Sequence, residues 1–195
     1  MNTLEQRILQ DGHVTQGGIL KVDSFLNHQM DVFLFREMGQ ELYRLFGDQG
    51  VTKILTLEAS GIGIACITAQ FFEVPALFAK KTRTKNIEGE VYTAPVASYT
   101  HGTTYDIIVS KKFLGPQDRV LVVDDFLARG NALLGMIQLV EQAGAHLVGC
   151  GIAVEKAFQE GGRRVRDLGV RVESLAVIAS MEGGQIQFQS QQGPV

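Results

Sequence analysis

The sequence RVLVVDDFLARGNA, residues 119–132, decides the fold. Its four consecutive apolar residues at 120–123 are typical of a strand buried on both faces, as in the centre of a parallel sheet. Asp124 and Asp125 follow at the carboxyl end of that strand, where open α/β sheets bind their ligands. A loop of small residues comes next: Ala128, Arg129, Gly130, Asn131 and Ala132. Because an apolar pattern of helical period follows it, we expect the loop's N–H groups at a helix N-terminus, which favours a phosphate.

Alternating strands and helices indicate how the rest of the chain surrounds this segment. We expect helices at 2–10, 31–46, 64–72, 133–144 and 160–168, and further strands at 52–57, 74–79, 145–154 and 170–178. This order predicts an α/β fold with a central, mostly parallel sheet and helices on both faces. Residues 90–99 and 105–109 are expected to form a hairpin, residues 19–30 a short strand and turn at the edge, and the tail from 185 an edge hairpin or frayed end.

Composition narrows the class of protein. The 195 residues fit a single domain, 1–195, and their 45% apolar content is ordinary for a globular chain. With 18 basic and 21 acidic residues the net charge is −3, which argues against nucleic acid as a partner. We expect no membrane partner, because no run approaches the ~18 apolar residues of a span. Cys66 and Cys150 lie in separate apolar runs and are expected to be free thiols, so we predict a cytoplasmic protein.

A second candidate anion site is the loop at 58–63, EASGIG. Ser60 and Gly61 precede a predicted helix, so backbone N–H groups can approach a phosphate closely there. The Gly61-x-Gly63 pair also fits the start of a dinucleotide-binding fingerprint, but Cys66 takes the place of its third glycine, which disfavours that interpretation.

A basic cluster follows the strand at 74–79. It consists of Lys80, Lys81, Arg83 and Lys85. These cations can neutralise a pyrophosphate leaving group, although a solvated charged turn is an alternative.

The hydrophobic strand, acidic pair and small-residue loop resemble the substrate motif of type I phosphoribosyltransferases. The loop differs from the commonest version, which has Thr-Gly-Gly-Thr where this chain has Arg129-Gly130-Asn131-Ala132, so backbone amides must do more of the binding. The resemblance implies that Asp124 and Asp125 stabilise a ribosyl cation. It implies that residues 128–132 bind the 5-phosphate of phosphoribosyl pyrophosphate, that Ser60, Gly61 and Lys81 bind its pyrophosphate, and that Mg²⁺ arrives with this substrate rather than at a protein metal site. A generic α/β strand with two solvated acids, as in response-regulator receivers, is the alternative.

Over nearly its full length the chain resembles the xanthine phosphoribosyltransferase branch of that family most closely. The segment Leu20-Lys-Val-Asp-Ser-Phe-Leu-Asn27 matches a hood, here mainly residues 1–30, that covers the purine. The resemblance implies base contacts from Leu20, Asn27 and Lys156, a homodimer, and a loop near 80–104 that closes over the reaction centre. Ala128 stands where hypoxanthine-guanine enzymes have an aspartate base, which suits xanthine because it is an acidic purine.

Three alternatives to phosphoribosyl transfer onto xanthine remain open. Guanine or hypoxanthine can replace xanthine as the acceptor base, because both also carry a 6-oxo group. Adenine enzymes also have alanine at position 128, but Lys156 suits a 6-oxo rather than a 6-amino purine. A regulator that senses phosphoribosyl pyrophosphate is disfavoured by the acidic net charge.

Overall fold

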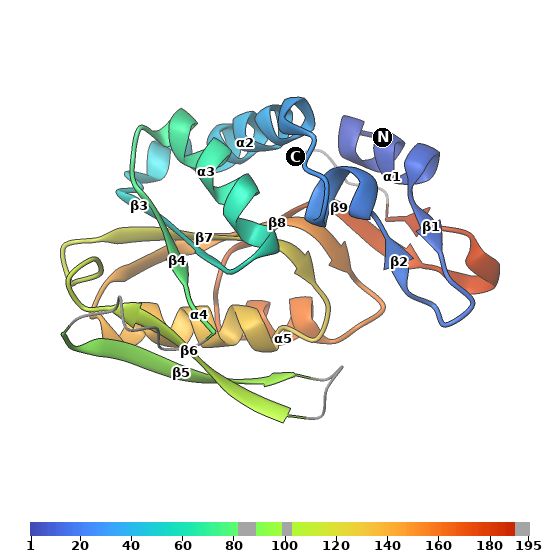
Figure 1. Ribbon diagram of the computed structural model, residues 1–195. Helices are drawn as coiled ribbons and strands as arrows, with labels where there is room; N and C mark the ends of the chain where they lie inside the picture. The colour runs from blue at the N-terminus through green and yellow to red at the C-terminus, as the bar shows by residue number, and fades with distance from the viewer. Residues whose placement is uncertain (82–88, 99–102, 190–195) are drawn as a thin grey trace.

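A six-stranded sheet forms the centre of the molecule (Figure 1). The structure, a computed structural model, describes residues 1–81, 89–98 and 103–189. The strand order is β10–β9–β8–β7–β3–β4; five strands are parallel, and the edge strand β10 is antiparallel to β9. The strands are β3 (Lys53–Leu57), β4 (Ala76–Ala79), β7 (Arg119–Leu127), β8 (His146–Lys156), β9 (Val172–Ser180) and β10 (Gln187–Phe188). The predicted parallel sheet is therefore confirmed, and the tail up to residue 189 includes an edge strand.

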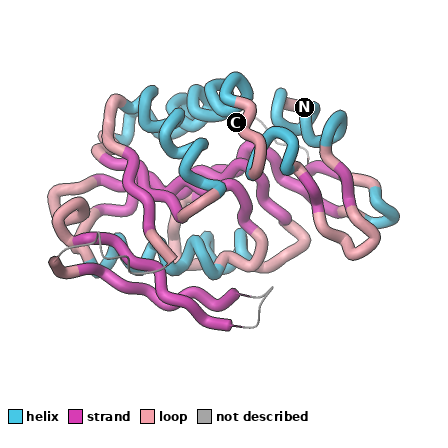
Figure 2. Tube along the Cα trace, in the orientation of Figure 1, coloured by secondary structure: helices cyan, strands magenta, loops and turns pink. Residues whose placement is uncertain are grey.

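Helices cover both faces of this sheet (Figures 1 and 2). The helices α2 (Val32–Phe46) and α3 (Ser60–Phe72) lie on one face, and α4 (Asn131–Gln142) and α5 (Gly161–Arg166) on the other. Asp31 is the N-cap of α2, and its Oδ1 accepts hydrogen bonds from the N–H groups of Phe33 and Leu34. No helix among the described residues has the length and apolar character needed to cross a membrane.

The N-terminal segment lies at the end of the molecule toward which the parallel strands point (Figure 1). It contains α1 (Thr3–Asp11), β1 (His13–Val14), β2 (Leu20–Lys21) and η1 (Asp23–Asn27). The expected turn after β2 is the short π-helix η1, which neither a helical nor a strand period predicts. Leu20, Phe25 and Leu26 are buried in the same apolar cluster as residues of α2 and α3, so this segment shares a core with the sheet.

A separate hairpin packs outside α4 (Figure 1). It consists of β5 (Val91–Ser98) and β6 (Thr103–Ser110), close to the two predicted strands. A Cβ placed on Gly135 of α4 would lie 2.6 Å from a methyl of Val96 and 3.2 Å from one of Ile107, so the absence of a side chain at Gly135 lets the hairpin approach closely. The predicted closing loop at 80–104 includes residues 82–88 and 99–102, which lie outside the described residues, as do Arg83 and Lys85 of the basic cluster.

The sheet separates two apolar clusters. One joins α1, α2, α3 and the N-terminal segment to residues such as Leu121 and Val123, and the other joins α4 and the hairpin to residues such as Val120 and Val122. Alternate residues of β7 thus enter opposite cores, which explains why positions 120–123 are all apolar. Two short 3₁₀ turns complete the fold, η2 (Gly47–Gln49) and η3 (Glu182–Gly184).

Candidate functional site

Asp124 and Asp125 lie near the carboxyl end of the central strand β7. Their charge suggested that the strand ends at these residues. Instead, the strand continues past them and pairs with β8 as far as Leu127. Both residues are consequently buried, at 6% and 8% exposure. Oδ1 of Asp124 accepts from the N–H of Asp125 at 3.0 Å. Burial, followed by the charge of Asp125, raises the pKa of Asp124 well above its usual value, and the positive charge of Lys81 opposes this rise.

The loop between β3 and α3 lies against this acidic pair. A Cβ on Gly61 would lie 3.2 Å from Oδ1 of Asp124 and would overlap Oγ1 of Thr56, so only glycine fits between them. Ser60, the first residue of α3, is half-buried. Oγ1 of Thr56 is buried and has no hydrogen-bond partner within the part of the chain that the structure describes. Sequence analysis missed Thr56, because a threonine inside a strand is unremarkable.

Lys81 brings a positive charge toward the same place. Its N–H donates to Oε1 of Glu58 at 2.6 Å, which joins the end of β4 to the start of the 58–63 loop. Its Nζ lies 5.7 Å from the ring centre of Tyr105 on the hairpin. Burial and the charge of Asp124 raise the pKa of Tyr105, so the hairpin also reaches the field of the acidic pair.

The loop at 128–130 leads directly into α4. Gly130 is the N-cap with φ +82°, a conformation that favours glycine, and its carbonyl accepts the bond from Leu134 at 2.9 Å. As in every helix, the N–H groups of the first turn have no partner in the helix, so those of Asn131 and Ala132 mark the place where the predicted anion site would lie. The side chain of Asn131 is engaged elsewhere: its Nδ2 donates to the carbonyl of Ala97 at 3.0 Å.

The three predicted base-contact residues lie at the carboxyl end of the sheet and in the N-terminal segment. The side chain of Leu20 is buried, whereas Asn27 is exposed at the end of η1. Lys156 is the last residue of β8, and its Nζ lies 5.4 Å from the ring centre of Phe126. Burial lowers the pKa of Lys156. The pairing with Phe126 was not predicted, since it depends on the register between β7 and β8.

Glu155, next to Lys156, anchors α5 to the sheet. Its carboxylate accepts two hydrogen bonds from Arg166, at 2.7 and 2.8 Å, and one from Ser174 Oγ at 2.5 Å. Burial raises the pKa of Glu155, but these donors outweigh it and the pKa lies below its usual value. Because strand side chains alternate, Glu155 faces α5 and Lys156 faces the opposite side.

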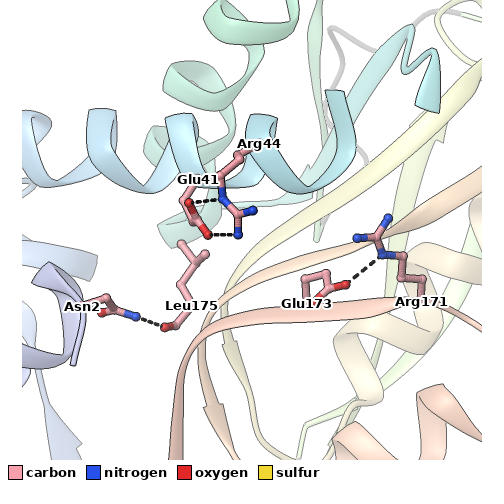
Figure 3. A network of polar contacts seen from close by, with 6 residues as sticks. All are labelled: Asn2, Glu41, Arg44, Arg171, Glu173 and Leu175. Carbon is pink, nitrogen blue, oxygen red and sulfur yellow. Dashed lines mark hydrogen bonds and ion pairs between the residues drawn. The ribbon is translucent and has the colours of Figure 1, made fainter. Parts of the chain in front are cut away.

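A groove of about 880 Å³ lies apart from these residues, between α1, α2 and β9. In it Arg44 pairs with Glu41 at 2.7 Å and Arg171 with Glu173 at 2.8 Å (Figure 3). Nδ2 of Asn2 donates to the carbonyl of Leu175 on the same wall. The groove contains none of the predicted site residues, and the charges in Figure 3 pair with one another. We therefore locate the candidate site at the acidic pair.

Known proteins share this chain's sequence and fold. Residues 21–191 match the phosphoribosyl transferase domain family. The chain is 57% identical over 188 residues to a protein of Ruminiclostridium cellulolyticum named xanthine phosphoribosyltransferase, covering 96% of this chain and 99% of that one. It is 58% identical over 190 residues to a protein of the same name from Lachnoclostridium phytofermentans, covering 96% and 98%.

Solved structures agree on the fold. The adenine phosphoribosyltransferase of Giardia lamblia, complexed with 9-deazaadenine, has a TM-score of 0.74 at 22% identity and covers 91% of this chain and 98% of its own. The Saccharomyces cerevisiae adenine phosphoribosyltransferase has a TM-score of 0.72 at 22% identity, with 90% and 99% covered. At such identities the likeness concerns the fold alone. With the family match over residues 21–191 and relatives more than 55% identical along almost the whole chain, the chain belongs to the phosphoribosyltransferase family.

Proposed function

We propose that this protein transfers the 5-phosphoribosyl group of phosphoribosyl pyrophosphate to a ring nitrogen of xanthine, giving xanthosine 5′-monophosphate and pyrophosphate, as a step of purine salvage. The relatives that share 57% and 58% of its residues are named xanthine phosphoribosyltransferase. The observation that carries the proposal is the buried acidic pair, because it is flanked by two loops that begin helices.

The acidic pair acts on the sugar in this proposal. Leaving-group departure gives the ribose an oxocarbenium-like charge, which nearby negative charge stabilises. Asp124 and Asp125 hold the ribose hydroxyls and supply that charge. Because burial and the charge of Asp125 raise the pKa of Asp124, the negative charge of Asp124 is most favourable when the positive sugar lies against it.

The two loops divide the phosphates between them. The N–H groups of residues 128–132 bind the 5-phosphate at the start of α4, and Ser60 and Gly61 bind the pyrophosphate at the start of α3. Lys81 neutralises the leaving pyrophosphate, and its backbone bond to Glu58 supports this role by joining β4 to the pyrophosphate loop.

Mg²⁺ fits this arrangement as a companion of the substrate. Among the described residues no group of three or more His, Cys, Asp or Glu side chains could hold a metal. Mg²⁺ is commonly bound by one or two carboxylates together with substrate phosphates, and Asp124 and Asp125 provide such carboxylates. Bound with the pyrophosphate, the ion would offset the charge of the leaving group.

The purine lies between the end of β8 and the N-terminal segment in this proposal. The ammonium of Lys156 donates to the 6-oxo group and favours an anionic purine, while Phe126 offers an aromatic face beside it. Leu20 contributes backbone contacts, which suits its buried side chain, and Asn27 contributes its amide at the 2-position. Residues 1–30 act as a hood within a single domain, 1–195. The resemblance to the family also supports a cytoplasmic location and a homodimer. Sedimentation equilibrium tests the homodimer.

The test is a nucleotide assay with labelled phosphoribosyl pyrophosphate, Mg²⁺ and each purine separately. The proposal expects xanthosine monophosphate to form with the highest kcat/KM. Faster transfer to guanine, hypoxanthine or adenine would support phosphoribosyl transfer but would show that xanthine is not the preferred acceptor. Binding of phosphoribosyl pyrophosphate without any nucleotide formed would support a sensor in place of an enzyme.

A further inference from the structure

Arg164 of α5 contacts the loop at 128–131 at two points. Its Nη1 donates to the carbonyl of Arg129 at 2.7 Å and to Oδ1 of Asn131 at 3.0 Å. The side chain of Arg164 is 38% exposed. From these contacts we propose that Arg164 is a positioning residue for the 5-phosphate, which holds the loop's N–H groups outward without touching the substrate. The inference rests on the proposed function, because it assigns a support to the loop that would bind phosphoribosyl pyrophosphate.

The peptide between Arg129 and Gly130 explains why such a support is needed. In a trans peptide the carbonyl and the N–H point in opposite directions, so the N–H of Gly130 points away from Arg164 as long as the carbonyl faces it. Gly130 has φ +82° and, as a glycine, can rotate at little cost. Rotation of this peptide would turn a carbonyl, which repels phosphate, to the side where an N–H should donate. The charge-assisted bond from Arg164 opposes that rotation.

The loop also rests on the backbone of α5. The N–H of Gly161 donates to the carbonyl of Ala128 at 3.0 Å, and a Cβ on Gly161 would lie 2.6 Å from the nitrogen of Gly130. Glu155 in turn fixes α5 through its two bonds from Arg166. Arg164 therefore acts from a helix that is itself anchored to the sheet, which makes it a rigid support.

Asn131 extends the same support to the hairpin. Its Oδ1 accepts from Arg164 while its Nδ2 donates to the carbonyl of Ala97 on β5. This orientation of the amide is unambiguous, because arginine only donates and a carbonyl only accepts. The side chain of Asn131 thus connects α5 to the hairpin, and its backbone N–H is what it offers to the phosphate. This loop lacks the two threonine hydroxyls of the commoner version, so its backbone geometry carries more of the affinity.

The experiment compares Arg164→Met, which keeps the aliphatic stem, with Arg163→Met on the same helix. Arg163 is exposed, so the control removes the same charge without removing the loop contact. Binding of ribose 5-phosphate, inorganic pyrophosphate and phosphoribosyl pyrophosphate is measured calorimetrically with Mg²⁺, together with KM for both substrates and kcat. Arg164→Met is expected to lower the affinity for ribose 5-phosphate about tenfold or more and to raise KM for phosphoribosyl pyrophosphate by a similar factor. Pyrophosphate binding and KM for xanthine should change less than about twofold, because the proposed contacts of both ligands lie outside residues 129 and 131, which Arg164 holds.

Arg164→Lys tests the mechanism by rescue. A lysine can still donate to the carbonyl of Arg129, so it should recover most of the affinity for ribose 5-phosphate. Thermal unfolding of each variant excludes a global defect, and a variant that binds pyrophosphate normally is folded. If Arg164→Met matches Arg163→Met while wild type binds ribose 5-phosphate, the inference is overturned and the proposed function stands. If wild type binds neither ribose 5-phosphate nor phosphoribosyl pyrophosphate, both are overturned.

Discussion

Replacing Asp124 by Asn should stabilise the fold at neutral pH while it damages the reaction. Asp124 is 6% exposed and lies beside the buried Asp125, and the positive charge of Lys81 offsets only part of the resulting cost of its ionisation. Because its folded pKa is raised, the stability due to protonated Asp124 is present below the unfolded pKa of about 3.8 and is lost as pH rises through the folded pKa. Asparagine removes the charge but keeps Oδ1 as an acceptor for the N–H of Asp125.

The expected gain follows from two opposing contributions. Two unit charges 4 Å apart repel by about 4 kcal/mol at an effective dielectric constant near 20, which is an upper limit for this pair because one carboxyl can take up a proton. Against it stands the weaker hydrogen bond that a neutral amide accepts from Asp125, a loss of about 1 kcal/mol. We therefore expect the free energy of unfolding to rise by roughly 1–3 kcal/mol at pH 7, or about 2–12 °C in Tm for a chain of this length.

The assay is thermal unfolding of the ligand-free protein between pH 5 and pH 8, with Asp106→Asn as the control. Asp106 is exposed on the hairpin, so its variant removes one negative charge without relieving burial. The gain for Asp124→Asn over wild type should grow as pH rises and should be absent from the control. A Tm equal to or below that of wild type at pH 7 and 8 would refute the idea that the fold tolerates a costly charge at the site.

Three further substitutions test individual residues of the site. Asp125→Asn should leave folding intact and lower kcat by about ten- to a thousandfold, since lost cation stabilisation costs a few kcal/mol; unchanged turnover would remove the pair from the mechanism. Lys156→Met should weaken the binding of xanthine and of guanine by roughly 1.5–3 kcal/mol each in binding titrations, with the larger loss for xanthine. Affinities equal to those of wild type would show that Lys156 does not contact the base. Asn27→Asp should lower kcat/KM for xanthine at least about tenfold while kcat/KM for guanine stays the same or rises, because an ionised aspartate can only accept hydrogen bonds. An unchanged ratio of the two kcat/KM values would exclude Asn27 from base selection.

Local patterns predicted the framework of the fold. The apolar run at 120–123 identified the central strand because both faces of that strand are buried, and the helical spacing after Gly130 located α4. The end of β7 was predicted too early, since two carboxylates normally mark the exit from a sheet. Here the backbone of Asp124 to Leu127 continues the ladder with β8, because hydrogen bonding of main-chain groups does not depend on side-chain charge.

Contacts across the chain lay beyond sequence analysis. The bond from Arg164 to the carbonyl of Arg129 joins residues 35 positions apart, and no periodicity distinguishes Arg164 from its neighbour Arg163. The buried network at Glu155 depends on the register of β8 against β9, which brings Ser174 within reach. Thr56 was missed for the same reason, because only its closeness to Gly61 and Asp124 sets it apart.

The division of the apolar interior by the sheet has an evolutionary consequence. The N-terminal segment packs with Phe25 and Leu26 into one core, while α4 and Val165 of α5 pack into the other. Substitutions that reshape residues 1–30 are therefore transmitted poorly to the opposite core. A lineage can diversify that segment, and an engineer can exchange it between relatives, with little effect on the packing of α4 and α5 in the opposite core.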